Sequence, residues 1–340
     1  MTLRVLHLVG SPASDFLCDL SRLYAQDCLN ATADPGRYEF HIAYVTPDQR
    51  WRFPVSLSRD AIADAPDCEL ADAVCGLTRL RPDVVVPQLF CRPGMTAYRA
   101  LFDVLGLPYI GSGPDVMALG ADKAKAKAVV AAAGVRVPAG EVLARGGQPS
   151  LAPPVVVKPV DGDNSLGTTL VRDRAGYAGA LAAAWEHSDR ALVESYVELG
   201  REVRCGLVVR DGELVGLPLE EYQVDPVSKP IRDHADKISR SGDGELQLVA
   251  KDPAHAWIVD PADPVTGPVW DAARRCHQAL GCRHYSLFDF RIDPAGQPWF
   301  LEAGLYCSFA EQSVVSTMAA AAGLPLPELF RTAIRETIGR

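Results

Sequence analysis

A hairpin near the C-terminal end of the chain is the feature that most restricts how this sequence folds. Residues 286–304 read SLFDFRID, PAGQ and PWFLEAG, so two apolar runs flank a turn that contains Pro and Gly. This pattern is typical of a β-hairpin. If PAGQ forms the turn, Asp293 faces Pro298, and counting outward places Asp289 directly opposite Glu302.

The same register predicts which side chains share a face, because side chains alternate along a strand. The face with the two carboxylates holds Leu287, Asp289, Arg291, Phe300, Glu302 and Gly304. Like charges that lie opposite each other destabilise a sheet, so the carboxylates need a cation. Mg²⁺ typically binds one or two carboxylates together with substrate phosphates. The pair is therefore a candidate Mg²⁺ site, and a solvated hairpin face is the alternative.

The composition fits a globular protein of two or three domains. The 340 residues are 48% hydrophobic and 23% charged, with a net charge of −9 and no basic stretch, which argues against nucleic acid as a partner. We find no apolar run of about 18 residues and no signal-peptide pattern. The nine cysteines show neither CxxC nor a Cys/His metal spacing. We therefore expect a cytoplasmic protein with reduced cysteines and no membrane segment.

Strands and helices alternate in the first third of the chain. The apolar patterns predict strands over residues 4–9, 39–45, 83–87 and 108–110 and helices over residues 15–30 and 95–105. Such alternation predicts an open, mostly parallel α/β sheet.

The rest of the chain has a different pattern. Residues 111–114 (GSGP) form an expected turn and hinge, and residues 115–135 an Ala-rich helix. From residue 153 onward, short strands indicate an α+β layer. Residues 224–263 lack periodicity, as in a functional lid.

Several separated segments carry groups that can hold a nucleotide. An apolar strand with one lysine, Lys158, runs into a loop of small polar residues, 161–167, whose backbone N–H groups can face phosphate oxygens. A later strand, 191–197, can offer a carbonyl and an amide to an adenine, and Glu202 can bind ribose hydroxyls. Each segment alone is also compatible with an ordinary turn or strand. The chain has no GxxxxGK[ST] loop, and its first strand is not followed by GxGxxG, which excludes a dinucleotide-binding dehydrogenase.

Together these segments resemble the ATP-grasp superfamily, and within it the D-alanine–D-alanine ligase family. The resemblance covers residues 3–335 and rests on the order and spacing of Asp122-Lys123, Lys158-Pro159, residues 194–197 (ESYV), residues 200–202 (GRE), Asp289 and Glu302. It implies a fold with both α/β and α+β layers, in which ATP lies between two antiparallel sheets. The implied domains are an open parallel α/β domain (1–114), a central ATP-grasp subdomain (115–195) and a C-terminal subdomain (196–340) with its lid at 224–263.

The resemblance also implies ATP and Mg²⁺ as cofactors and a ligase mechanism. A carboxylate attacks the γ-phosphate of ATP to give an acyl phosphate and ADP, and an amine then displaces phosphate to form an amide. The implied metal ligands are Asp289 and Glu302. The implied ATP contacts are Lys123, Lys158, Gly167, Glu194, Ser195, Val197, Glu202 and Leu301, the last packing on adenine from the face opposite Glu302. The implied catalytic contacts are Asn164 and Ser165 in the small-residue loop and Lys237 in the lid.

Two departures from the family pattern lie in the hairpin. Leu287 stands where the family has an arginine aimed at the reacting phosphoryl group. We expect Arg291, or alternatively Arg283, to take over that charge. Gly304 replaces an asparagine that binds metal in the family. Either one Mg²⁺ is held more by phosphates, or water or another side chain substitutes.

Other departures concern the amino-acid pockets. Asp15 is the nearest candidate for binding the substrate ammonium. Arg92 lies where the family has a histidine and a glutamate, and it can bind a carboxylate or phosphate or lie on the surface. Ser313 matches a family serine that binds the carboxylate of the acceptor.

These differences predict a specialised ligase that joins an amino acid or related carboxylate to an amine in a small-peptide or natural-product pathway. A homodimer is common in the family. The alternatives are an enzyme of the same fold that activates a carboxylate and cyclises it, and a catalytically impaired ATP-binding protein.

Overall fold

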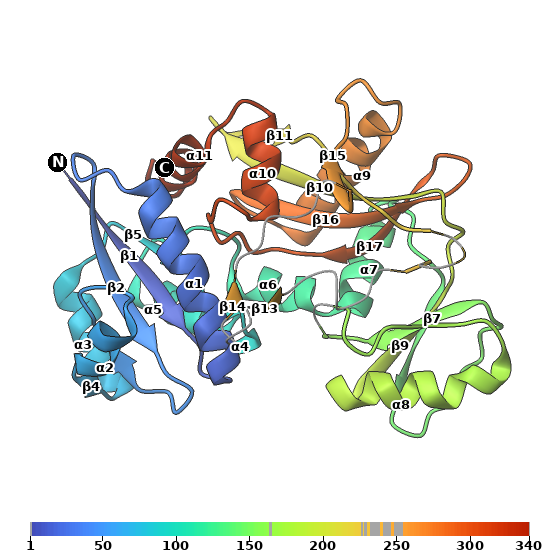
Figure 1. Cartoon of the computed structure of the whole chain (residues 1–340), viewed down its shortest axis with the longest axis horizontal. Helices are drawn as coiled ribbons and strands as arrows, with labels where there is room; N and C mark the ends of the chain where they lie inside the picture. Colours follow the sequence, from blue (N-terminus) through green and yellow to red (C-terminus); the bar gives the residue numbers. More distant parts are fainter. Residues whose placement is uncertain are drawn as a thin grey trace.

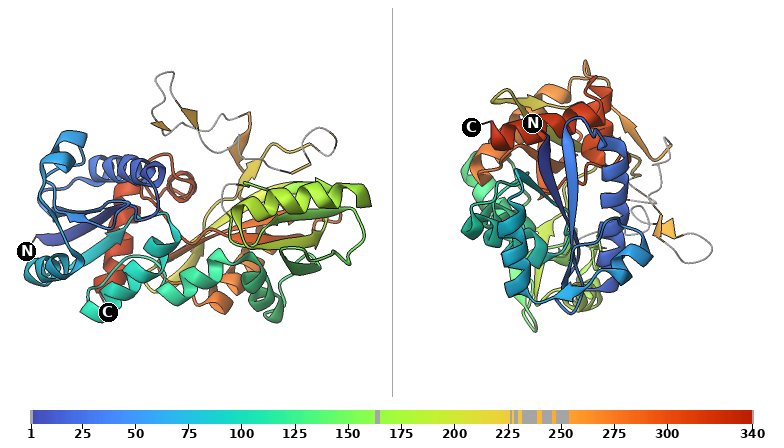
Figure 2. Two further views of the ribbon diagram at one scale, coloured as in Figure 1. Left: turned by 90° about the horizontal axis from the view of Figure 1, so that it is seen from below. Right: turned by 90° about the vertical axis from the view of Figure 1, so that its left-hand side faces the viewer.

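Three sheets of four or more strands organise the described part of the chain (Figure 1). The computed structural model describes residues 2–162, 165–225, 227, 230–231, 239–240, 246–247 and 254–339. The first sheet contains parallel strand pairs, and the other two are antiparallel, which confirms the expected combination of α/β and α+β layers. The two ends of the chain lie at the same end of the molecule (Figure 2).

The N-terminal sheet has the order β4-β3-β2-β1-β5. Its parallel core strands are β1 (Leu3–Gly10), β2 (Tyr38–Val45) and β5 (Val84–Pro87), and its antiparallel edge strands are β3 (Trp51–Arg52) and β4 (Asp67–Cys68). Its helices are α1 (Asp15–Thr32), α2 (Arg59–Asp64), α3 (Leu70–Leu80), α4 (Arg92–Met95) and α5 (Ala97–Leu105).

Two expectations for this region differ from the structure. The strand expected at residues 108–110 is a single parallel bridge between Val85 and Tyr109. The helix expected over residues 95–105 is preceded by a separate short helix, because the chain breaks at Thr96, whose φ and ψ are −119° and −81°.

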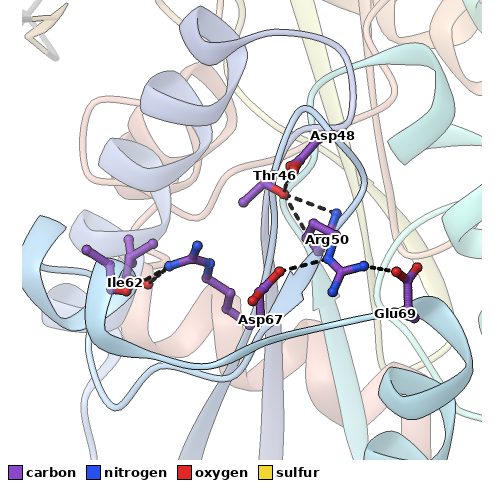
Figure 3. A network of polar contacts seen from close by, with 8 residues as sticks. Thr46, Asp48, Arg50, Ile62, Asp67 and Glu69 are labelled. Atoms are coloured by element: carbon purple, nitrogen blue, oxygen red, sulfur yellow. Dashed lines mark hydrogen bonds and ion pairs between the residues drawn. The ribbon is translucent and has the colours of Figure 1, made fainter.

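Polar contacts hold the antiparallel edge of the first sheet (Figure 3). The Nε of Arg50 donates to Asp67 at 2.8 Å, and its Nη1 pairs with Glu69. Thr46 accepts a hydrogen bond from the backbone N–H of Arg50 at 3.1 Å. These contacts close the turn after β2 and hold β4 beside it.

The helical run expected over residues 115–135 is two helices, α6 (Pro114–Ala121) and α7 (Lys123–Ala132). The break falls at Asp122, whose side chain accepts a hydrogen bond from the N–H of Lys125 at 3.0 Å and so caps α7. Arg190 also pairs with Asp122, at 2.8 Å. The cap therefore fixes where Lys123 begins the second helix.

The two antiparallel sheets follow. The four-stranded sheet has the order β6-β9-β7-β8 and comprises β6 (Gly140–Ala144), β7 (Val155–Pro159), β8 (Thr169–Val171) and β9 (Arg190–Ser195), covered by α8 (Tyr177–His187) after the 3₁₀ turn η1 (Arg174–Gly176). The six-stranded sheet has the order β15-β12-β10-β16-β17, with β11 paired to β10. Its strands are β10 (Arg201–Arg210), β11 (Glu213–Gly216), β12 (Glu220–Tyr222), β15 (Ala256–Ile258), β16 (Tyr285–Ile292) and β17 (Pro298–Ala303).

Three helices pack against the six-stranded sheet and complete the core. They are α9 (Thr266–Leu280), α10 (Val314–Ala321) and α11 (Leu326–Ile338). One apolar cluster joins α7 and α9 to Phe288, Phe290 and Phe300. A second cluster joins α10 and α11 to strands β1 and β5, so the C-terminal helices bind the last sheet to the first (Figure 1).

Much of the expected lid at residues 224–263 lies outside the described residues. Within that range β13 (Ser239–Arg240) pairs with β14 (Leu246–Gln247), and β15 joins the edge of the six-stranded sheet. Residues 256–258 of the expected lid are thus a sheet strand. None of the described helices is long and apolar enough to cross a membrane.

Two buried histidines predict a loss of stability in acid. Burial lowers the pKa of both His7 and His277 from 6.5 to about 4. The unfolded chain therefore binds more protons than the folded chain between these values, and stability falls as the pH falls from 6.5 towards 4. Each histidine is expected to lower the free energy of unfolding by about 3 kcal/mol as the pH falls across this window.

The measurement is the free energy of urea unfolding at both ends of the window. A His277→Asn variant should lose less stability on acidification than the wild type. His187→Asn is the control, because His187 is exposed. Equal acid losses in the His277→Asn variant and the wild type would contradict the prediction.

Candidate active site

A pocket lies between the four-stranded and the six-stranded sheets. Eleven of the residues predicted from the sequence line it: Lys123, Lys158, Ser165, Glu194, Ser195, Val197, Glu202, Asp289, Arg291, Leu301 and Glu302. They come from α7, β7, β9, β10, β16, β17 and the loops beside them. Segments more than 170 residues apart thus converge on one site, as seen in the 3.5 Å contact between Lys123 and Glu302.

The four-stranded sheet contributes a buried ion-pair cluster. Glu194 on β9 forms ion pairs with Lys158 on β7 at 2.5 Å and with Lys127 on α7 at 2.9 Å. Burial alone raises the pKa of Glu194, but the two ammonium groups outweigh it and hold that pKa below its usual value. Burial lowers the pKa of Lys127 to about 8 despite its carboxylate partner. The cluster therefore places two buried lysine ammonium groups beside the pocket. Both depend on the single carboxylate of Glu194 for an opposite charge.

The six-stranded sheet contributes a row of charged side chains across four neighbouring strands. Glu220 on β12 lies opposite Arg204 on β10, Arg204 lies opposite Asp289 on β16, and Asp289 lies opposite Glu302 on β17. The Nε and Nη2 of Arg204 donate to the two oxygens of Asp289 at 2.6 and 3.2 Å. Burial disfavours the charged guanidinium, but the charge of Asp289 outweighs it, so the pKa of Arg204 is raised well above its usual value.

The hairpin pairs Asp289 with Glu302, as predicted, but through a different register. The ladder pairs Ile292 with Pro298, so the expected pairing of Asp293 with Pro298 is wrong. Asp293 instead accepts hydrogen bonds from the N–H groups of residues 295 and 297 at 3.0 and 2.8 Å, which lengthens the turn by one residue.

A β-bulge restores the predicted carboxylate pair. Phe290 pairs with Phe300 and Asp289 with Glu302, so Leu301 is the extra residue of the bulge. The expectation that Phe300 shares the face of the carboxylates is wrong, because Phe300 is fully buried among the aromatic residues of the core. Leu301 was expected on the face opposite Glu302, yet both line the pocket, because a bulge interrupts the alternation.

The two alternative arginines take different positions. The Nη2 of Arg291 donates to Glu202 at 2.7 Å, and the guanidinium also contacts the carbonyls of Val197 and Pro230 at 3.2 and 2.9 Å. Arg283 donates to the carbonyl of Gly111 at 2.8 Å in the segment expected to be a hinge. Arg291 therefore lies in the pocket, and Arg283 contacts the segment that links α5 to α6.

An Arg291→Ala variant is expected to weaken ATP binding more than it slows the chemical step. The arginine orders Glu202 and the segment that follows β9, where the family resemblance places adenine and ribose. Loss of charged hydrogen bonds of this kind costs about 1.5–3 kcal/mol. We expect KM for ATP to rise about tenfold or more with a smaller fall in kcat.

Steady-state kinetics with ATP as the varied substrate measure this effect. Arg210→Ala is the control, because Arg210 lies on the same sheet and is exposed. A fall in kcat at unchanged KM would instead support the role at the reacting phosphoryl group expected from the sequence.

The small-residue loop lies at the mouth of the pocket. Ser165 lines the pocket with a φ of 57°, and Lys123 donates to the carbonyl of Gly162. Gly167 lies outside the pocket lining; a Cβ there would come within 2.7 Å of the carbonyl oxygen of Ala183 on α8. Its φ of 66° and this close approach require glycine and anchor the loop on α8. Asn164 and Lys237 lie outside the described residues.

The three substrate candidates do not line this pocket in the described part of the chain. Asp15 is exposed at the first turn of α1. Arg92 pairs with Asp161 at 3.6 Å, beside the small-residue loop. Ser313 caps α10 and lies 2.8 Å from the hydroxyl of Ser316. Their roles in binding an amino acid stay predictions.

Two charged residues of the site were missed in the sequence. Lys127 lies one helical turn after Lys123 in the segment KAKAKA, and this spacing puts both lysines on one face of a helix. Arg204 lies two residues after Glu202, and strand alternation puts both on one face. The local spacing in the sequence therefore already indicated that Lys127 and Arg204 share a face with predicted site residues.

Two antiparallel sheets that enclose lysines and opposed carboxylates define an ATP-grasp protein. Residues 143–335 match the family described as "D-ala D-ala ligase C-terminus". The D-alanine–D-alanine ligase of Sinorhizobium fredii is 30% identical over 315 residues, which cover 87% of this chain and 97% of that protein. The chain belongs to the D-alanine–D-alanine ligase family, as the sequence motifs predicted.

Further relatives and solved structures agree with this assignment. The D-alanine–D-alanine ligase of Methylorubrum extorquens is 32% identical and aligns with 78% of this chain and 84% of its own. The VanG D-Ala:D-Ser ligase of Enterococcus faecalis superposes with a TM-score of 0.79 at 21% identity, covering 99% of this chain and 100% of that one. The Bacillus anthracis D-alanine–D-alanine ligase complexed with ATP gives a TM-score of 0.72 at 18% identity over 99% and 98% of the two chains. These structures share the fold.

Proposed function

We propose that the chain is an ATP-dependent, ADP-forming ligase that joins a carboxylate to an amine through an acyl phosphate. The observation that carries the proposal is the pocket between the two sheets, with Lys158 on one side and the pair of Asp289 and Glu302 on the other. Opposed carboxylates facing a cation-rich pocket suit the binding of a nucleotide triphosphate with a divalent metal ion.

The donor set fits Mg²⁺, because both carboxylates supply hard oxygen ligands and line the same pocket. When bound there, Mg²⁺ would neutralise phosphate oxygens and make the γ-phosphate easier to attack. Lys123 and Lys158 would hold the other phosphates, and Arg291 would order Glu202 for the ribose. The loop around Ser165 would exclude water from the reactive acyl phosphate.

The substrates are proposed to be an amino acid or related carboxylate and an amine. Relatives of this chain are named for D-alanine and D-serine ligation, so these amino acids come first among the candidates. Leu287 and Gly304 depart from the family motif, which favours a specialised peptide or natural-product pathway over cell-wall synthesis. A cytoplasmic location suits the nine free cysteines, because thiols stay reduced there.

The test is release of ADP and phosphate from Mg²⁺-ATP in the presence of pooled D- and L-amino acids, with mass spectrometry of the products. Release that requires both a carboxylate and an amine, together with an amide mass, supports the proposal. Release that requires only the carboxylate, with loss of water in the product, favours the cyclising alternative. Nucleotide binding without turnover in any pool would contradict both and favour an impaired ATP-binding protein.

A further inference from the structure

Behind the pocket, the six-stranded sheet carries a guanidinium that contacts one of the carboxylates lining the pocket. Arg204 on β10, whose side chain is 15% exposed, binds both oxygens of Asp289, at 2.6 and 3.2 Å. Its guanidinium also lies 5.3 Å from the centre of the Tyr222 ring. Bidentate contact and a stacked aromatic ring fix the position of a guanidinium far better than either alone.

The two departures of the hairpin lie side by side next to this arginine. Leu287 belongs to a buried apolar cluster with Phe309 and Met318, so no cation can lie at that position. A Cβ on Gly304 would lie 3.7 Å from a methyl carbon of Leu287. Compared with the family pattern, the site therefore lacks both the arginine at position 287 and the metal-binding asparagine at position 304. Arg204 lies one strand away, on the same face as Leu287, because Asp289 alternates with Leu287 along β16.

We propose that Arg204 is a built-in cation of the phosphate site that takes the place of a second divalent metal ion. This narrows the metal ligands named under the proposed function: the chain would bind one divalent ion, through Glu302 and the nucleotide phosphates, while Asp289 stays paired with Arg204. This inference rests on the proposed function, because it assigns a role within the same ATP site.

Electrostatics explains why the guanidinium and a second ion exclude each other. A divalent ion binds a carboxylate oxygen at about 2.1 Å, so an ion on Asp289 would lie within about 5 Å of the guanidinium. Repulsion between a fixed unit charge and a dication at that distance is strong in a partly buried site. Glu302 is farther along the row, and its side chain is 31% exposed against 10% for Asp289, so its oxygens are the more accessible ligands for a metal ion.

Arg204 is a positioning residue in this scheme, and the count of bound metal ions reports its role. The probe is Mn²⁺, titrated by electron paramagnetic resonance into the protein saturated with a non-hydrolysable ATP analogue. We expect one Mn²⁺ per chain in the wild type. Arg204→Gln should bind a second Mn²⁺, or bind the first roughly tenfold more tightly, because the repelling charge is gone. Arg204→Lys keeps the charge and should keep the count at one.

Arg201→Gln is the matched control. Arg201 lies on the same strand and also makes a bidentate pair, but its partner is Glu221, which does not line the pocket, whereas the partner of Arg204 is Asp289, which does. The Arg201→Gln variant should therefore bind the same number of Mn²⁺ ions per chain as the wild type. Two Mn²⁺ ions per chain in the wild type would overturn the inference even if Arg204→Gln failed to fold. So would an Arg204→Gln variant that binds Mn²⁺ as the wild type does.

The experiment separates this inference from the proposed function. Binding of a fluorescent ATP analogue is measured first, in the wild type. Absence of nucleotide binding contradicts the proposed function itself. Nucleotide binding accompanied by two Mn²⁺ ions contradicts only the role of Arg204.

Discussion

A Glu302→Gln variant is expected to lose about a thousandfold in kcat/KM for the ligase reaction. Glutamine keeps the size of the side chain but removes the charge with which Glu302 would hold the divalent ion. A metal ion at a phosphoryl group supplies several kcal/mol of transition-state stabilisation, and about 4 kcal/mol corresponds to a thousandfold in rate. The measurement is ADP release at saturating and subsaturating ATP, with Mn²⁺ binding measured in parallel.

Glu302 is a cleaner test of the metal site than Asp289. Asparagine at position 289 would leave the partly buried guanidinium of Arg204 without the carboxylate of Asp289 and so destabilise the fold. The Glu302 side chain is 31% exposed, and its partner Lys123 also donates to Gly162, so glutamine at position 302 leaves Lys123 with a hydrogen-bond partner.

The control for this variant is Glu213→Gln. Glu213 is exposed on β11 of the same sheet and lies outside the pocket. It should have wild-type kinetics. Turnover of Glu302→Gln close to the wild type, with unchanged Mn²⁺ binding, would remove Glu302 from the metal site and contradict the proposed arrangement.

Local sequence spacing was enough to predict the carboxylate pair but not the path of the backbone between its members. Two differences cancelled: the turn is one residue longer than expected, and a bulge at Leu301 adds one residue to the opposite strand. The longer turn follows from Asp293, whose carboxylate binds backbone N–H groups instead of leaving the residue in the ladder. A bulge has no such local signature, so the faces of Phe300 and Leu301 could not be read from alternation.

The partners of the charged residues depend on strand order, which local spacing does not specify. Alternation predicts that Glu202 and Arg204 share a face, but β10 pairs with β16, more than 70 residues later in the chain. Only this pairing brings Arg204 to Asp289. The buried contact of Lys127 with Glu194 likewise requires α7 to pack beside the four-stranded sheet. The types of residue at the site could therefore be predicted from the sequence, whereas the partners in its ion pairs could be identified only from the folded structure.

A Glu194→Gln variant is expected to lose about 3–5 kcal/mol of unfolding free energy at neutral pH. Glu194 is 2% exposed and is the shared partner of Lys127 and Lys158. Glutamine still accepts a hydrogen bond but leaves two buried ammonium groups without an opposite charge. Chemical denaturation measures the loss, and Glu198→Gln is the control because Glu198 is exposed on the same segment.

The pH dependence of this loss identifies its cause. Burial lowers the pKa of Lys127 to about 8 from the usual 10.5 of a lysine, so between these values the unfolded chain binds more protons than the folded chain. Stability from this group therefore rises with pH across that window. The deficit of Glu194→Gln should shrink as the pH rises above about 8, because neutral Lys127 no longer needs a carboxylate. A deficit that stays constant up to pH 10 would assign the loss to packing and not to the buried charges.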